Sequence, residues 1–174
     1  MAPAPTGTLL LFLILVLSVA AVASARRHPG DGVMVTVLAA GAASCAVAAA
    51  LMHDIQLVPG LLPAFPFLAA GFAGLRRSRF GAATRFLAAS SAVYAGAILL
   101  TQYGDGGSAE WGGRYFAAGL PLAIPLAVAG ARDAAKGLER PARGALVTGL
   151  VVVTAMSSFT ALRGMHEIHA GTRW

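Results

Sequence analysis

One segment of the sequence contains enough polar side chains to carry out chemistry. Residues 103–115 read Tyr-Gly-Asp-Gly-Gly-Ser-Ala-Glu-Trp-Gly-Gly-Arg-Tyr and include two carboxylates, Asp105 and Glu110, and one guanidinium, Arg114. The carboxylates could bind a divalent cation, take up a proton or accept a hydrogen bond from a hydroxyl. Arg114 precedes an apolar run, and a guanidinium beside a helix N-terminus is a good receptor for a phosphate. The glycines allow close approach of a ligand.

The same residues also have a purely structural interpretation. Trp111 and Tyr115 are residue types that anchor a chain at the membrane–water interface, and the long stem of Arg114 lets its charge reach water. Asp105 and Glu110 would then keep the loop solvated. Both interpretations place this segment at a membrane surface, so the neighbouring elements must position it.

The overall composition is typical of an integral membrane protein. Of the 174 residues, 57% are hydrophobic and only 11% are charged, whereas a soluble domain has about 45–50% apolar and about 25% charged residues. These values exclude an ordinary water-soluble enzyme, and the hydrophobicity excludes a disordered chain. The one cysteine, Cys45, can form neither an intramolecular disulfide nor a zinc cluster.

Six apolar stretches are long enough, or nearly so, to cross a bilayer as helices, which takes roughly 20 residues. None of them contains Asp, Glu, Lys or Arg. They are residues 8–25, 33–52, 57–75, 86–102, 115–131 and 145–162. Long runs without alternation favour helices over barrel strands. We therefore expect an all-α, polytopic membrane protein with about six transmembrane helices in a single domain, residues 1–174.

The basic residues predict the orientation of these helices. Ten of the 13 lie in loops 26–32, 76–85 and 132–144, which alternation places on one side of the membrane. The ten are Arg26, Arg27, Arg76, Arg77, Arg79, Arg85, Arg132, Lys136, Arg140 and Arg143. Cytoplasmic loops carry this excess, so we expect both termini and the 103–114 loop to be extracytoplasmic. The net charge of +6 then reflects topology and not nucleic-acid binding.

Two features of the apolar stretches leave alternatives open. Ala23-Ser24-Ala25 resembles a signal-peptidase site, although Met1 to Thr8 has no basic residue and Arg26-Arg27 follows at once, which favours a retained helix. Prolines crowd the third and fifth stretches and indicate either a broken, re-entrant segment or an ordinary kink. These prolines are Pro59, Pro63, Pro66, Pro121 and Pro125.

The run Trp111-Gly112-Gly113-Arg114-Tyr115, followed by Leu120-Pro121, resembles a "WGxRY…LP" run of bacterial polytopic proteins of the GT-C glycosyltransferase superfamily. The resemblance covers about residues 90–165. It implies an enzyme-like membrane protein that binds a polyprenyl-phosphate-linked sugar on the extracytoplasmic face. Asp105, Glu110, Trp111, Arg114 and Tyr115 would contact the lipid phosphate or the acceptor, with a divalent cation near the two acids as an option.

One departure from the family concerns catalysis. The family's catalytic acid lies in the first outer loop, whereas the first loop here is basic, so no catalytic residue can be assigned. We therefore expect a C-terminal portion of such a protein, or a reduced relative, that is incomplete as a catalyst and has a partner membrane subunit as an option. The alternatives are a small transporter or channel subunit and a structural assembly subunit. His166 and His169 are spaced to share a metal, but the sequence offers no third ligand.

Overall fold

The computed structural model describes residues 5–52, 62, 65–75, 81–102 and 118–171, and the statements below concern these residues. They form six helices and no strand, which confirms the all-α expectation. The helices are α1 (Pro5–Arg27), α2 (Gly32–Leu51), α4 (Pro66–Gly74), α5 (Ala82–Gln102), α6 (Leu120–Ala135) and α7 (Arg140–Gly171).

Three helices are long and apolar enough to cross a membrane. These segments are Leu9–Arg27, Gly32–Leu51 and Arg140–Arg163, and only 33% of the residues in each apolar window are buried inside the protein. Large apolar side chains point outward along all three, as Val16, Val37 and Val151 do. A surface of this kind suits lipid, so the chain has the helices of a multi-pass membrane protein.

The third predicted stretch differs from the observed helices at a proline. The third predicted stretch, 57–75, is not one continuous helix, because Phe65 has non-helical backbone angles (φ −130°, ψ 69°) and Pro66 starts a new helix of nine residues. Proline suits this first position since its missing N–H has no helical acceptor there. In α6, by contrast, Pro125 lies inside the helix. In the described residues, the third stretch is therefore interrupted at Phe65, whereas α6 continues through Pro125.

The helices differ in length relative to the thickness of a membrane. Helix α6 has 16 residues and begins at Leu120, so it starts later than the predicted stretch 115–131 and ends four residues beyond it. Helices α4 and α6 are both shorter than the roughly 20 residues that a full crossing needs. Helix α7 has 32 residues, or about 48 Å at 1.5 Å per residue, which exceeds the hydrocarbon core of about 30 Å.

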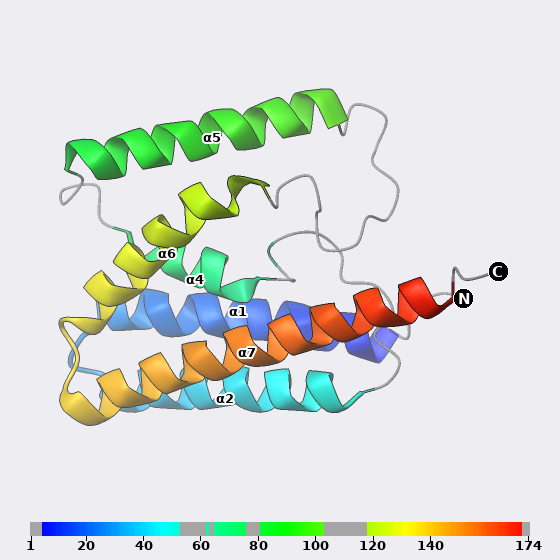
Figure 1. Cartoon of the computed structure of the whole chain (residues 1–174). Coiled ribbons are helices and arrows are strands. Elements are labelled where there is room, and N and C mark those ends of the chain that lie inside the picture. Colours follow the sequence, from blue (N-terminus) through cyan, green and yellow to red (C-terminus); the bar gives the residue numbers. More distant parts are fainter. Residues whose placement is uncertain (1–4, 53–61, 63–64, 76–80, 103–117, 172–174) are drawn as a thin grey trace.

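The helices form layers around α1 (Figure 1). Helices α1, α2 and α7 pack as one bundle, α4 and α6 pack on another face of α1, and α5 lies outermost against α6. A short turn joins α1 to α2, where the Met34 amide donates a hydrogen bond of 3.0 Å to the Asp31 carboxylate and so caps α2.

Small residues let these helices approach closely. A Cβ atom at Gly149 of α7 would lie 2.9 Å from the carbonyl oxygen of Ala39 on α2, and one at Gly71 of α4 would collide with the backbone of Ala127 on α6. Gly130 of α6 is pressed against Gly71 in the same way. Backbone approach of this kind is typical of helix pairs in membranes.

One end of the bundle holds the loops 28–31 and 136–139 and the start of α5 (Figure 1). The other end holds the start of α1 and the end of α7. We call the first of these ends the basic end, because it holds described basic residues from five helix termini and loops. They are Arg26, Arg27, Arg85, Arg132, Lys136, Arg140 and Arg143.

Candidate functional site

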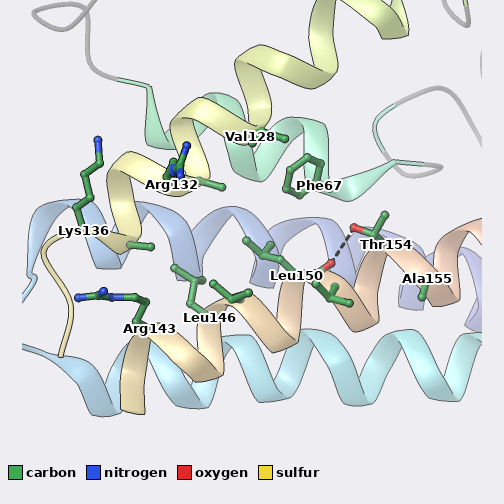
Figure 2. A pocket seen from close by; sticks show the side chains of 13 residues that line it. Phe67, Val128, Arg132, Lys136, Arg143, Leu146, Leu150, Thr154 and Ala155 are labelled. Atoms are coloured by element: carbon green, nitrogen blue, oxygen red, sulfur yellow. Dashed lines mark hydrogen bonds between the residues drawn. The ribbon is translucent and has the colours of Figure 1, made fainter. Parts of the chain in front are cut away.

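A cavity of about 750 Å³ lies between α6 and α7, with Phe67 of α4 on its wall. We call it the α6–α7 groove. Helices α6 and α7 are joined by a short connection at the basic end and make few direct contacts with each other. The groove therefore occupies the wedge between two helices that diverge from a shared turn, and Figure 2 shows its lining side chains.

The narrow end of the groove is cationic. Arg132, Lys136 and Arg143 line it, and Figure 2 shows all three gathered at the same end. Arg132 and Lys136 are four residues apart, which places them on one face of the α6 terminus. Arg143 lies one turn into α7. The short connection between the helices places Arg143 at the same end of the groove as the other two cations.

Local contacts hold two of these cations in place. The Arg143 guanidinium donates a hydrogen bond of 3.0 Å from Nη2 to the carbonyl oxygen of Leu138, a buried residue of the connection. The Lys136 ammonium lies 2.7 Å from the Asp133 carboxylate. Among the described residues, the Arg132 guanidinium has no acceptor. Three cations line the narrow end, and the connection adds the Glu139 carboxylate to that of Asp133, so the narrow end keeps an excess of positive charge.

The rest of the groove wall is apolar. Leu146 and Leu150 are buried at its floor, four residues apart on one face of α7. Val147 and Val151 lie at its exposed edge, so the groove reaches the protein surface. The Thr154 hydroxyl donates a hydrogen bond of 2.7 Å to the Leu150 carbonyl, so this hydroxyl is satisfied within its own helix.

The length of the groove along α7 can be compared with the thickness of a membrane. Its lining on α7 runs from Arg143 to Ala155, which is about 18 Å of helix at 1.5 Å per residue. This is close to half of a hydrocarbon core of about 30 Å. An amphipathic anion with its charge at the basic end would reach the middle of the bilayer with its apolar part.

The site residues predicted from the sequence lie elsewhere in the chain. Asp105, Glu110, Trp111, Arg114 and Tyr115 all fall outside the described residues, so the loop interpretation stays a prediction. The structure likewise leaves the option of a divalent cation near the two acids untested.

The two C-terminal histidines fall within α7. His166 and His169 lie in the last two turns of that helix. In the described part of the chain, no group of three potential metal ligands occurs.

Sequence reasoning missed the groove. It treated Arg132, Lys136 and Arg143 only as markers of membrane sidedness. A usable signal was present, because two cations spaced by four residues end one apolar run and a third begins the next run seven residues later. That pattern predicts clustered charge at a helix hairpin, but it does not predict that the two helices diverge.

Comparisons of this chain with protein-family models, with curated proteins and with solved structures find no match.

Proposed function

We propose that this chain is a glycosyltransferase-like, multi-pass membrane protein that binds a polyprenyl-phosphate-linked sugar at the extracytoplasmic surface and is incomplete as a catalyst. It has six membrane segments in this proposal, with both termini and the 103–115 loop on the extracytoplasmic side. Arg114 binds the lipid phosphate, Trp111 and Tyr115 position the loop at the interface, and Asp105 and Glu110 accept hydrogen bonds from the sugar or the acceptor.

The observation that supports this proposal most directly is the start of α6. The described helix begins at Leu120-Pro121, five residues after Tyr115, so a helix N-terminus follows the Trp-Gly-Gly-Arg-Tyr run in the chain. Backbone N–H groups at such a terminus are free to bind an anion, and the helix dipole favours negative charge there. Helix α6 ends at the basic end (Figure 1), and therefore its N-terminus points away from the cytoplasmic side inferred from the charges.

Replacing Arg114 with lysine tests the proposal. Lysine keeps the charge but cannot make the two parallel hydrogen bonds of a guanidinium to a phosphate. We expect Arg114→Lys to weaken binding of undecaprenyl phosphate by about tenfold, the effect of losing one charge-assisted hydrogen bond. Binding would be measured on the purified chain in detergent by fluorescence titration, with helical content checked by circular dichroism.

Arg173→Lys is the matched control, because this arginine lies on the same predicted side outside the motif. Equal affinities for the wild type and Arg114→Lys would reduce Arg114 to an interfacial anchor, since an anchor needs only a long stem and a charge.

A further inference from the structure

We propose that the α6–α7 groove binds an anionic glycerophospholipid taken from the membrane leaflet at the basic end. The phosphate lies among Arg132, Lys136 and Arg143, and one acyl chain runs along α7 towards Ala155. This site is distinct from the 103–115 loop, goes beyond the proposed function and stands whether or not that function is correct.

The charges at the narrow end select an anion. Arg132, Lys136 and Arg143 outnumber the two carboxylates of this stretch of chain, Asp133 and Glu139. Donors also remain available, because Arg143 uses one guanidinium N–H on Leu138 and Lys136 uses one ammonium N–H on Asp133 out of five and three respectively. A phosphate bridging α6 and α7 would therefore find a charged donor on both helices, and such bonds are stronger than neutral ones.

The apolar wall selects a ligand with a hydrocarbon chain. Val147 and Val151 form its open edge and Leu146 and Leu150 its floor, so a water-soluble anion would leave most of the wall uncovered. A chain in the groove would bury apolar surface on both helices.

The dimensions of the groove select a lipid of one leaflet. The phosphate and one acyl chain of a glycerophospholipid together span half of the bilayer. The groove has a similar length, about 18 Å from Arg143 to Ala155. Its open side faces the surface between two helices whose outer faces are apolar, so the lipid would enter sideways from its own leaflet with its headgroup remaining at the membrane surface.

Native mass spectrometry of the whole chain in detergent tests the proposal. The chain would be supplied with equimolar phosphatidylglycerol and phosphatidylcholine that carry the same acyl chains. We expect the wild type to retain phosphatidylglycerol preferentially. The double variant Arg132→Gln/Arg143→Gln should reduce this preference by about fivefold for each cation removed, the contribution of one surface cation near an anionic lipid.

Matched variants test whether lipid retention depends on the residues of the groove, and not on any nearby positive charge or any added bulky side chain. Arg140→Gln removes a cation one turn from Arg143 that does not line the groove, and it should leave the preference unchanged. Val151→Trp fills the groove edge and should lower retention of both lipids. Val37→Trp places the same bulk on α2, at a residue with the same exposed fraction of 61%, and should not.

Several results would overturn the site. They are equal retention of the two lipids by the wild type, an unchanged preference in the double glutamine variant, and equal lipid loss in the two tryptophan variants. Stronger retention of undecaprenyl phosphate than of phosphatidylglycerol would overturn the phospholipid assignment in favour of a polyprenyl carrier. Arg132→Lys/Arg143→Lys, which keeps both charges, should retain the preference and shows whether a folded double variant can be obtained.

Discussion

Two glycines of α7 show how single residues control the packing of this bundle. Gly149 faces α2, where an added Cβ atom would lie 2.9 Å from the Ala39 carbonyl oxygen and 3.0 Å from its Cβ. Gly144, five residues earlier on the same helix, has open space at the equivalent position within the described structure. The sequence places both Gly144 and Gly149 in an apolar run, and only the contact with the neighbouring helix distinguishes them.

We therefore expect opposite effects from the same substitution. Gly149→Ala should lower the free energy of unfolding by about 1–3 kcal/mol, because the methyl group forces α2 and α7 apart. Gly144→Ala should raise it by roughly 0.5–1 kcal/mol, because alanine favours a helix over glycine. Thermal unfolding in detergent, followed by circular dichroism, measures both. Equal shifts for the two variants would contradict the α2–α7 contact described above.

At the scale of elements, α2 and α7 form the most extensive helix pair, although they are far apart in the chain. A Cβ atom at Gly32 would lie 3.0 Å from the Cβ of Ala142. This separation is slightly shorter than the 3.5–4.5 Å typical of a disulfide, so a small shift of one helix terminus would allow a bridge.

Cysteines at these two positions should therefore cross-link. In a Cys45→Ser background, we expect Gly32→Cys/Ala142→Cys to lose both thiols to copper-catalysed oxidation and to recover them with dithiothreitol, as measured by maleimide labelling and mass. Val37→Cys/Ala142→Cys is the control, because Val37 points outward and should keep its thiol. If the control pair cross-linked as readily as the test pair, the observed orientation of α2 would be wrong.

At the scale of the whole molecule, the described basic residues gather at one end of the bundle (Figure 1). Cytoplasmic membrane loops carry such an excess of arginine and lysine. The narrow, cationic end of the α6–α7 groove lies at that same end, whereas the 103–115 loop precedes the opposite terminus of α6 in the chain. In the proposed topology, the two proposed ligand sites belong to opposite membrane surfaces.

Site-directed labelling measures this topology. In the Cys45→Ser background, we expect Ser108→Cys to react with a membrane-impermeant maleimide in intact cells, because its loop is extracytoplasmic in the proposed arrangement. Ser78→Cys lies in a predicted cytoplasmic loop and should react only after the membrane is permeabilised. Reaction of both cysteines in intact cells would rule out the six-segment topology.

Hydropathy and charge along the chain were sufficient to predict the all-α class and the approximate bounds of α1, α2 and α5, whereas α7 extends beyond the predicted stretch 145–162 at both ends. Both properties can be read from short segments of the chain. An uninterrupted apolar run of sufficient length predicts a helix in lipid, and basic residues in the loops predict on which side of the membrane each loop lies. The interruption at Phe65 was one of two open alternatives, since a proline can either kink a helix or begin one. The predicted loop site, centred on Arg114, stays a prediction because it lies outside the described residues.

The α6–α7 groove was decided by tertiary structure alone. Its cations come from Arg132 and Lys136 on one side of a turn and Arg143 on the other, and the sequence shows only that all three border apolar runs. Whether a wedge opens between the two helices depends on other contacts. Helix α6 packs closely against α4 at Gly130 and Gly71, and α7 packs closely against α2 at Gly149. Because each helix packs best against a different partner, a cavity is left between them, and no property of α6 or α7 by itself encodes it.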